Sequence, residues 1–114
     1  GKQVSLYNTH LSYNSTALRR KQFAQILDAL ENDPNPYRIL FGDFNAGASE
    51  FAQLRGYTVV NTADTLFYNY AGALLAKNEI DNIVVSDNIT VLNARMVETG
   101  SSDHRPLIAY LVLR

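Results

Sequence analysis

The chain has 114 residues, 46% of them hydrophobic, with a formal net charge of −1 and no cysteine. This length supports one domain at most, with a modest core. The charge balance argues against a protein that holds nucleic acid mainly through a basic surface, and the lack of cysteine excludes disulfides, thiolate metal sites and thiol nucleophiles. No stretch reaches the length of a membrane span and the first residues do not resemble a signal peptide, so the compartment stays open.

The first predicted strand, residues 3–10, ends in a histidine. The side chains of a strand alternate between its two faces. One face carries, in order, Val4, Leu6, Asn8 and His10. An apolar face of this strand therefore leads directly to His10.

A helix is expected next, ending before the Asn-Asp-Pro run at residues 32–34. Ser12, Asn14 and Ser15 can each accept the first amide protons of this helix, and the sequence does not choose among them. A hydrophobic stripe with helical spacing marks the side that faces the core. It consists of Phe23, Ile26, Leu27 and Leu30.

Three consecutive cations, residues 19–21, fall in the first turns of this helix. The dipole of a helix disfavours positive charge near its N-terminus. Two interpretations are open. Either an anionic group lies nearby, which makes Arg19 a candidate for substrate binding, or the cations form a solvated face of the helix.

A second strand is predicted over residues 38–45, with Ile39, Phe41, Asp43 and Asn45 on one face. Strand, helix and strand of these lengths predict a right-handed crossover, in which the two strands are parallel. The side chains of His10 and Asp43 then lie at the same carboxyl end of the sheet. Ligands bind at this end in open α/β sheets.

Four more strands are predicted in the second half of the chain, and they cover residues 57–60, 79–86, 89–98 and 107–113. A short helix over residues 49–55, closed by Gly56, precedes them. Between the first and second of these strands the sequence has little periodicity. Within that stretch, residues 71–73 (Ala-Gly-Ala) suggest a loop or a hairpin tip.

Four polar clusters lie at the ends of the strand-like runs and contain both histidines of the chain. They are Asn8-Thr9-His10-Leu11, Gly42-Asp43-Phe44-Asn45, Glu79-Ile80-Asp81-Asn82 and Ser101-Ser102-Asp103-His104-Arg105-Pro106. If the later strands run antiparallel to the first two, all four clusters gather at one edge of a single sheet. Such groups transfer protons, coordinate metals and contact phosphate oxygens. Seen alone, each residue is better explained by a structural role: Asp43 as a turn cap, Asp81 as a surface charge, Asn45 as an Asx-turn residue and His10 as a histidine bonded to backbone.

In order and spacing, the four clusters resemble the second half of the endonuclease/exonuclease/phosphatase superfamily. That superfamily includes pancreatic-type deoxyribonucleases, exonuclease III-like repair nucleases, neutral sphingomyelinases and inositol-phosphate phosphatases. The resemblance runs from about Val4 to Val112. It implies an α/β (α+β) fold that forms half of a four-layer α/β/β/α sandwich, with a mixed sheet and helices on one face. Residues 1–114 are then expected to be the C-terminal half of such a domain.

The resemblance also implies a metal-dependent phosphoester hydrolase, with Mg²⁺ or Mn²⁺ as the cofactor. Asp103 is similar to the metal-binding carboxylate of the family's second half. Asp43 resembles the carboxylate that orients or deprotonates the attacking water, and Asn45 the amide that positions this water and the phosphate. His104 matches the histidine that donates to a phosphoryl oxygen. Asp81 matches the carboxylate that holds the ring of that histidine.

Substrate contacts are expected from His10, Asn45 and Arg19. His10 resembles the additional histidine of the deoxyribonuclease and sphingomyelinase branches, which lies close to the scissile phosphate. The implied substrate is nucleic acid, a phospholipid head group or a small phosphate ester, and the sequence does not choose among them.

The family's first half supplies an asparagine and a glutamate, the second principal metal ligand, and neither segment is in this sequence. Because the chain starts on a strand without a Met, we expect an excised fragment or a processed product. The intact parent protein is then the enzyme, and this chain alone is weak or inactive.

The alternative is a non-catalytic half-domain that serves as a binding or assembly module. In both cases its apolar sheet faces predict a partner, either the missing N-terminal half or a second copy in a homodimer.

Overall fold

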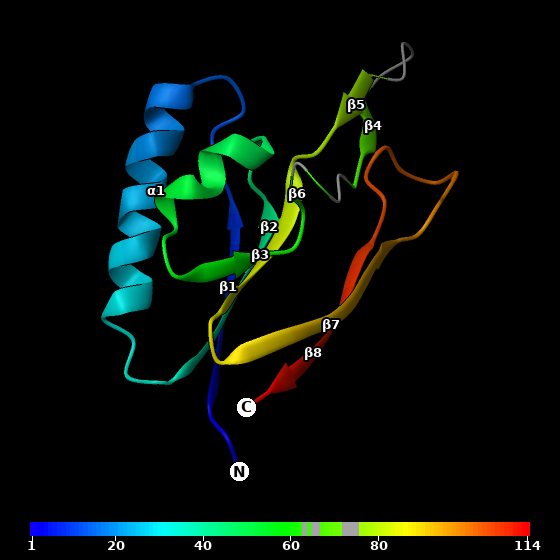
Figure 1. Cartoon of the computed structure of the whole chain (residues 1–114). Coiled ribbons are helices and arrows are strands. Elements are labelled where there is room, and N and C mark those ends of the chain that lie inside the picture. Colours follow the sequence, from blue (N-terminus) through cyan, green and yellow to red (C-terminus); the bar gives the residue numbers. More distant parts are fainter. Residues whose placement is uncertain (63, 65–66, 72–75) are drawn as a thin grey trace.

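In the computed structural model, the chain forms a mixed four-stranded sheet, with a long helix on one face and a two-stranded ribbon on the other (Figure 1). The structure describes residues 1–62, 64, 67–71 and 76–114. The elements are β1 (Val4–His10), α1 (Thr16–Glu31), β2 (Tyr37–Asp43), the 3-10 helix η1 (Ala48–Gln53), β3 (Tyr57–Val59), β4 (Asn69–Ala71), β5 (Ala76–Asn78), β6 (Asp81–Ser86), β7 (Ile89–Met96) and β8 (Leu107–Leu113). Among the described residues, no helix has the length and apolar character that a membrane crossing requires.

The four-stranded sheet has the order β1-β2-β6-β3. β1 and β2 are parallel, as the sequence predicts for two strands joined by a helix. β6 runs antiparallel to β2 and to β3. The expected α+β fold with a mixed sheet is therefore confirmed.

Helix α1 begins after Ser15, one of the three candidate start residues. The side chain of Ser15 accepts a hydrogen bond from the backbone N–H of Leu18 at 3.0 Å. At the other end, the backbone and side-chain amides of Asn32 both donate to the carbonyl oxygen of Asp28. The predicted end of the helix before residues 32–34 is confirmed.

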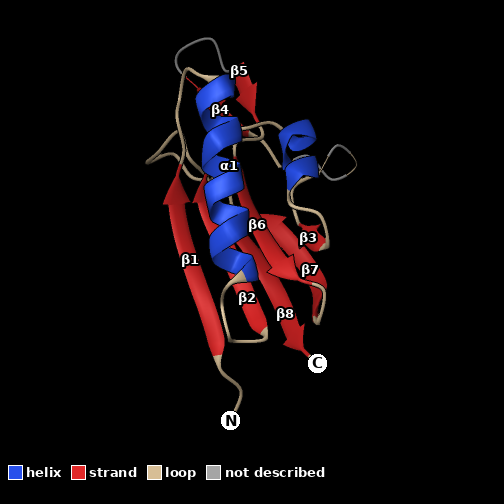
Figure 2. Cartoon of the chain, turned by 90° about the vertical axis from the view of Figure 1, so that its left-hand side faces the viewer, coloured by secondary structure: helices blue, strands red, loops and turns tan. Residues whose placement is uncertain are grey.

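The main core lies between α1 and the sheet, where Figure 2 shows the helix running along the strands. Phe23 and Leu30 of the helix are fully buried against Leu40 of β2 and Val84 of β6. The ring of Phe23 also stacks at 6.1 Å, centroid to centroid, on that of Phe44, just after β2. The hydrophobic stripe of the helix thus faces the core, as predicted.

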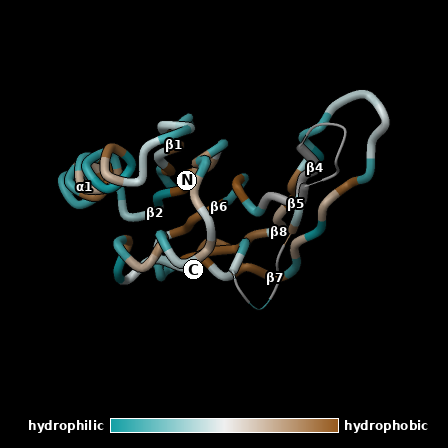
Figure 3. The backbone as a smooth tube through the Cα atoms, turned by 90° about the horizontal axis from the view of Figure 1, so that it is seen from above, coloured by the Kyte–Doolittle hydropathy of each residue, from teal (hydrophilic) through white to brown (hydrophobic). Residues whose placement is uncertain are grey.

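A second, smaller core joins the opposite face of the sheet to the β7–β8 ribbon. Figure 3 shows hydrophobic residues recurring along this ribbon. Tyr37, Val85 and Ile89 are its buried members, and the partly buried residues around them are Val4, Ile39, Ile83, Val91, Leu111 and Leu113. On the edge strand β1, Val4 packs against this core, whereas Leu6 remains 66% exposed. The apolar face that the sequence predicts on this strand is thus covered only in part.

The expectation of a single sheet is wrong for the last strand. β8 pairs with β7 and forms a separate two-stranded sheet. Within the four-stranded sheet, β6 already has β2 on one side and β3 on the other, so no edge of β6 is available to β8. The loop before β8 therefore reaches the site from a different layer.

Several smaller expectations also need correction. The segment after β2 forms a 3-10 helix, η1, and Gly56 behind it has the positive φ of +84° that the sequence predicts for a helix end. β2 ends at Asp43, so Asn45 lies beyond the strand and adopts a φ of +50°. Of the expected hairpin tip, Ala71 ends β4, and residues 72 and 73 lie outside the described residues.

The two faces of the sheet differ in burial, so the same leucine-to-alanine substitution should lower the free energy of unfolding by different amounts on each face. Leu40 is 1% exposed and faces α1, whereas Leu6 is 66% exposed. We expect Leu40→Ala to lower the free energy of unfolding by about 2–5 kcal/mol, and Leu6→Ala to change it by less than about 0.5 kcal/mol. Urea unfolding followed by circular dichroism measures both values. An equal loss in the two variants would show that Leu6 is covered in solution.

Candidate functional site

The register of the sheet brings three of the predicted site residues into one row. His10, the last residue of β1, is the Cα partner of Asp43, the last residue of β2. Asp43 is in turn the Cα partner of Asp81, the first residue of β6. Because β6 runs in the opposite direction, its beginning meets the ends of the two parallel strands. The predicted edge of polar side chains is present for these three residues.

A glycine allows the close approach of two strands beside this row. Gly42 has a φ of +141°, and a Cβ at this position would lie 2.0 Å from the carbonyl oxygen of Thr9. No side chain fits at that distance, and the positive φ disfavours any residue other than glycine. Gly42 is therefore a site-supporting residue that the sequence analysis did not single out, although it directly precedes Asp43.

The two carboxylate oxygens of Asp43 have different surroundings. Oδ1 accepts a hydrogen bond from the backbone N–H of Asn45 at 2.9 Å, which closes an Asx turn after the strand. Oδ2 lies 3.5 Å from Nε2 of His10 and 3.7 Å from Nε2 of His104. The side chain of Asp43 is 20% exposed. One oxygen thus fixes the orientation of the carboxylate, and the other faces both histidines of the chain.

Asn45 connects the ends of the two parallel strands. Its side-chain amide donates to the carbonyl oxygen of Leu11 at 2.9 Å, directly after β1. Together with its backbone bond to Asp43, this contact keeps the two strand ends at a fixed separation. Asparagine tolerates the positive φ found here better than most residues. The residue lies beside the row, as expected, but on a turn.

His104 and Asp81 form the hydrogen-bonded pair that the sequence predicts. Nδ1 of His104 lies 2.8 Å from Oδ2 of Asp81. Because a carboxylate can only accept, Nδ1 carries the proton and donates it. The backbone N–H of His104 donates to Oγ of Ser102 at 3.0 Å, which shapes the loop before β8. The ring orientation of His104 is therefore set by a partner from another sheet.

The negative charges around His104 raise the pKa of its imidazole. The hydrogen bond that His104 donates to Asp81 is the largest cause, and the charges of Asp81, Asp43 and Asp103 act in the same direction. Partial burial opposes them, because it disfavours the charged ring. The imidazole of His104 thus binds its second proton more readily than an isolated histidine.

A buried amide network, which the sequence analysis missed, holds the start of β6. The side chain of Asn61 donates to the carbonyl oxygens of Asp81 and Phe67, each at 2.9 Å. Asn82 completes the network, since its side chain accepts from the backbone N–H of Asn61 at 2.8 Å and donates back to its carbonyl oxygen at 2.9 Å. Both asparagines are buried. Buried amides are tolerated when bonded in this way, and here they fix the backbone of Asp81.

Asp103 lies apart from the other carboxylates. Among the described residues, Asp43, Asp81 and His104 place potential metal-ligating atoms within 4.8 Å of one another. Asp103 does not belong to this group, is exposed, and acts on His104 through its charge. An exposed carboxylate suits Mg²⁺, which usually takes one or two protein carboxylates and completes its shell with water and phosphate oxygens.

The surroundings of Arg19 do not support its expected role in substrate binding. Its side chain is buried and forms a two-pronged ion pair with Glu50, in which Nε donates at 2.9 Å and Nη2 at 3.1 Å. Nη1 donates to the carbonyl oxygen of Ser12, with a longer contact to that of Tyr13, and Nη2 also donates to Oγ1 of Thr16. All N–H directions of the guanidinium are thus used inside the protein. Arg19 braces α1 against η1.

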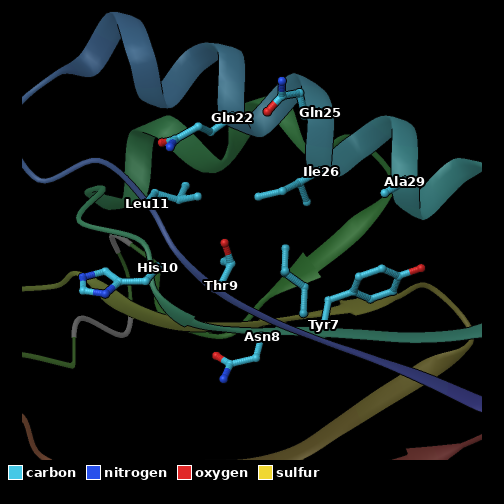
Figure 4. A pocket seen from close by; sticks show the side chains of 10 residues that line it. Tyr7, Asn8, Thr9, His10, Leu11, Gln22, Gln25, Ile26 and Ala29 are labelled. Carbon is cyan, nitrogen blue, oxygen red and sulfur yellow. The ribbon is translucent and has the colours of Figure 1, made fainter.

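Two hollows flank the row. The first, of about 330 Å³, contains the two carboxylates and is lined by Phe41, Gly42, Asp43, Asp81, Asn82, Ile83 and Leu107. The second, of about 320 Å³, lies between β1 and α1, and the residues that Figure 4 labels there are Tyr7, Asn8, Thr9, His10, Leu11, Gln22, Gln25, Ile26 and Ala29. Only His10 of the row borders this second hollow. The first hollow is therefore the one that belongs to the candidate site.

No protein-family model matches the sequence, and no curated protein matches it. Solved structures do match. A humanised D. rerio TDP2 with 14 mutations aligns with a TM-score of 0.78 and 20% identity, over 98% of this chain and 56% of that one. D. rerio TDP2 complexed with a single-strand DNA product aligns with a TM-score of 0.74 and 18% identity, over 94% of this chain and 55% of that one. An endonuclease/exonuclease/phosphatase from Bacteroides vulgatus aligns with a TM-score of 0.75 and 19% identity, over 92% of this chain and 48% of that one.

The chain thus spans about half the length of the solved structures that it matches. At these identities the agreement concerns the fold. The fold is that of an endonuclease/exonuclease/phosphatase half-domain, as the sequence resemblance implies.

The pair between Asp81 and His104 predicts a titration shift. Asp81→Asn keeps an acceptor oxygen but removes the charge, so we expect it to lower the pKa of His104 towards the usual value of about 6.5. An NMR titration of the ring protons of His104 measures this change. Asp87→Asn, in the exposed β6–β7 turn, is the control and should leave the pKa unchanged. An unchanged pKa in Asp81→Asn would contradict the assignment.

The sign of the stability effect follows from the raised pKa of His104. A group with a folded pKa above its unfolded value stabilises the protein fully below the unfolded pKa, and this contribution is lost as pH rises through the folded pKa. We expect the difference in unfolding free energy between wild type and Asp81→Asn to be larger below about pH 6.5 and to shrink at higher pH. Urea unfolding at a series of pH values checks this trend.

Proposed function

We propose that the chain is the C-terminal half of a metal-dependent phosphoester hydrolase domain, and that its row of polar residues acts on a phosphoryl group. One observation carries this proposal. His10, Asp43 and His104 converge at the carboxyl end of two parallel strands, with Asp81 holding the ring of His104. Ordinary packing does not require two histidines around one carboxylate oxygen, whereas phosphoester hydrolysis requires groups that donate and accept protons there.

In this proposal His104 is the donor to a phosphoryl oxygen. Its Nδ1–H donates to Asp81 at 2.8 Å, and its Nε2 atom faces Asp43. The raised pKa of His104 increases the fraction of the ring that carries a proton on Nε2 near neutral pH. Asp81 acts through His104, as the residue that orients it.

In this proposal Asp43 orients or deprotonates the attacking water. Its Oδ1 is occupied by the N–H of Asn45, so Oδ2 is the oxygen that faces the reacting atoms. Asn45 keeps the carboxylate oriented through its backbone N–H, and the proposal assigns the contact with the phosphate to its side-chain amide. The side chain of His10 is 73% exposed and approaches the same oxygen from the solvent side, where a substrate arrives.

The metal of the proposed reaction is Mg²⁺ or Mn²⁺, and Asp103 is the residue of this chain that would hold it. When bound, such an ion neutralises charge on the phosphoryl oxygens. A single carboxylate binds Mg²⁺ weakly, so the proposed site needs ligands from a further segment. We therefore assign full activity to the parent protein and weak or no activity to the 114-residue chain.

Nucleic acid is the substrate class that we place first. One of the matching structures, D. rerio TDP2, is complexed with a single-strand DNA product. The net charge of −1 implies that such a substrate is held by local contacts at the site and not by a basic surface. A phospholipid head group and a small phosphate ester remain the alternatives, and turnover of each class distinguishes them.

The partner that we propose is the N-terminal half of the same domain. The chain spans about half the length of its structural matches, and it exposes large apolar side chains on the sheet and on the ribbon. Among them are Leu6, Leu92, Tyr110 and Val112. The alternative function, a non-catalytic binding or assembly module, uses the same surfaces. It differs in that the parent protein would not hydrolyse phosphoesters.

The catalytic proposal predicts the effect of two substitutions in the parent protein. We expect His104→Ala and Asp43→Ala each to lower kcat for hydrolysis of bis(p-nitrophenyl) phosphate by at least about 100-fold, because each removes a proton-transferring group. Circular dichroism should show little loss of fold. Asp87→Ala, an exposed carboxylate in the β6–β7 turn, is the matched control. Near-normal turnover in both site variants would rule out the catalytic role.

The partner proposal predicts association of the isolated chain. Without the N-terminal half, copies should pair through their apolar surfaces, since burial of apolar area contributes about 25 cal/mol per Å². We expect dimers or larger species in sedimentation velocity at micromolar concentration. Leu92→Glu on the ribbon should shift the chain towards monomer, and Leu18→Glu on α1, also exposed, is the control. A wild-type monomer that unfolds cooperatively would contradict the proposal.

A further inference from the structure

We propose that the ring of Tyr13 stacks on a base of a single-stranded nucleic-acid substrate, and that Arg19 is the positioning residue that holds the loop of Tyr13 in place. Neither residue transfers a proton in the proposed reaction. This role of Tyr13 rests on the proposed function, because it names a substrate contact beside the same row of polar residues.

Tyr13 lies on the surface, in the loop of residues 11–15 between β1 and α1. Its side chain is 82% exposed, more than any other large hydrophobic side chain among the described residues. The exposed apolar side chains on the sheet and the ribbon fit the proposed contact with the N-terminal half. Tyr13 belongs to neither of these surfaces, so its exposure needs a separate explanation.

The loop starts at the row of polar residues. Tyr13 follows His10, the last residue of β1, by three positions, which span at most about 11 Å. In a nucleic acid strand each base is joined to its phosphate through a single sugar. A strand with a phosphate at His10 therefore brings a neighbouring base to the loop that carries Tyr13.

Hydrogen bonds tie the first part of this loop to β2 and to α1. The backbone N–H of Leu11 donates to the carbonyl oxygen of Asp43 at 3.1 Å, and the carbonyl oxygen of Leu11 accepts from the side chain of Asn45 at 2.9 Å. The backbone N–H of Ser12 donates to Oε1 of Gln22 at 2.9 Å. The backbone just before Tyr13 is thus fixed to two other elements.

Arg19 holds the backbone at Tyr13 itself. Its Nη1 donates to the carbonyl oxygen of Ser12 at 3.0 Å, with a longer contact of 3.5 Å to that of Tyr13. The guanidinium is fixed in turn, because Nε and Nη2 donate to the carboxylate of Glu50. A buried and fully paired arginine therefore holds the loop that presents an exposed ring. A contact that is ordered before the ligand arrives loses less entropy on binding.

Stacking provides binding energy that the charge of this chain does not. With a net charge of −1, the chain has no large excess of cations to neutralise phosphates. Every base presents a flat aromatic face, so an exposed ring binds single strands with little dependence on their sequence. Because Tyr13 contacts the base and not the reacting phosphate, it should act on substrate binding and not on the chemical step.

Binding of two oligonucleotides to the parent protein tests this role. The probes are a short fluorescein-labelled oligothymidylate and an abasic strand of the same length, measured by anisotropy with EDTA present to prevent cleavage. We expect Tyr13→Ala to weaken binding of the oligothymidylate at least about 5-fold and to leave binding of the abasic strand unchanged. Tyr13→Phe keeps the ring and should bind as wild type does. Leu18→Ala, another exposed apolar side chain near the start of α1, is the control.

The positioning role of Arg19 has its own variant. Arg19→Lys keeps a positive charge beside Glu50, but lysine lacks the fork that reaches the loop carbonyl at the same time. We expect it to lower the ratio of the two affinities, oligothymidylate over abasic strand. In a Tyr13→Ala background the same substitution should not change this ratio further, because the two residues act through one contact. An effect of Arg19→Lys on folding stability alone, with the wild-type ratio, would contradict the positioning role.

Steady-state cleavage of the oligothymidylate gives a second readout. Tyr13→Ala should raise KM and leave kcat unchanged. Equal loss of affinity for both strands in Tyr13→Ala, or wild-type affinity for the oligothymidylate, would overturn the stacking role. A parent protein that prefers the oligothymidylate through Tyr13 but does not hydrolyse it would contradict only the proposed function. Hydrolysis that is independent of Tyr13 would contradict only the stacking role.

Discussion

The alignment of three strands is the constraint on which the site depends. His10, Asp43 and Asp81 are successive Cα partners across β1, β2 and β6. Asp43 and Asp81 are therefore adjacent carboxylates, an arrangement that is destabilising by itself. The ring of His104 offsets this repulsion, since its two nitrogens face the two carboxylates. A shift of β6 by one residue would turn Asp81 to the other face of the sheet and remove the pair.

His104 reaches the row because of packing elsewhere in the chain. The β7–β8 ribbon is held against the sheet by a hydrophobic cluster around Val85 and Ile89, remote in sequence from His104. At the other end of the ribbon, the backbone N–H of Val97 donates to the carbonyl oxygen of Pro106 at 2.9 Å and closes the loop that carries His104. The histidine is thus positioned by the ribbon as a whole, which couples packing on one face to the chemistry at the sheet edge.

Polar side chains at two places in the chain differ in how fully their hydrogen-bonding groups are paired, and this difference separates structural residues from candidate functional ones. Arg19 and Asn61 are buried, and the donor groups of their side chains bond to protein acceptors. Such groups stabilise a particular arrangement of loops and contribute little to an external ligand. Asp43 and His104 are partly exposed, and their facing atoms stand farther apart than a hydrogen bond. The facing atoms of this second set are not held together by a direct hydrogen bond, unlike those of Arg19 and Asn61.

Local patterns determined a large part of this structure. Period-two alternation, the helical stripe from Phe23 to Leu30 and the Asn-Asp-Pro stop predict the first strands and α1, and the polar clusters point to the residues that meet. The resemblance of these clusters identified the pairing of Asp81 with His104. Tertiary structure alone decided that Arg19 is buried against Glu50, that Leu6 is exposed and that β8 leaves the main sheet. The physical reason is that periodicity specifies which side chains share a face, whereas the cover of that face comes from segments far away in the sequence.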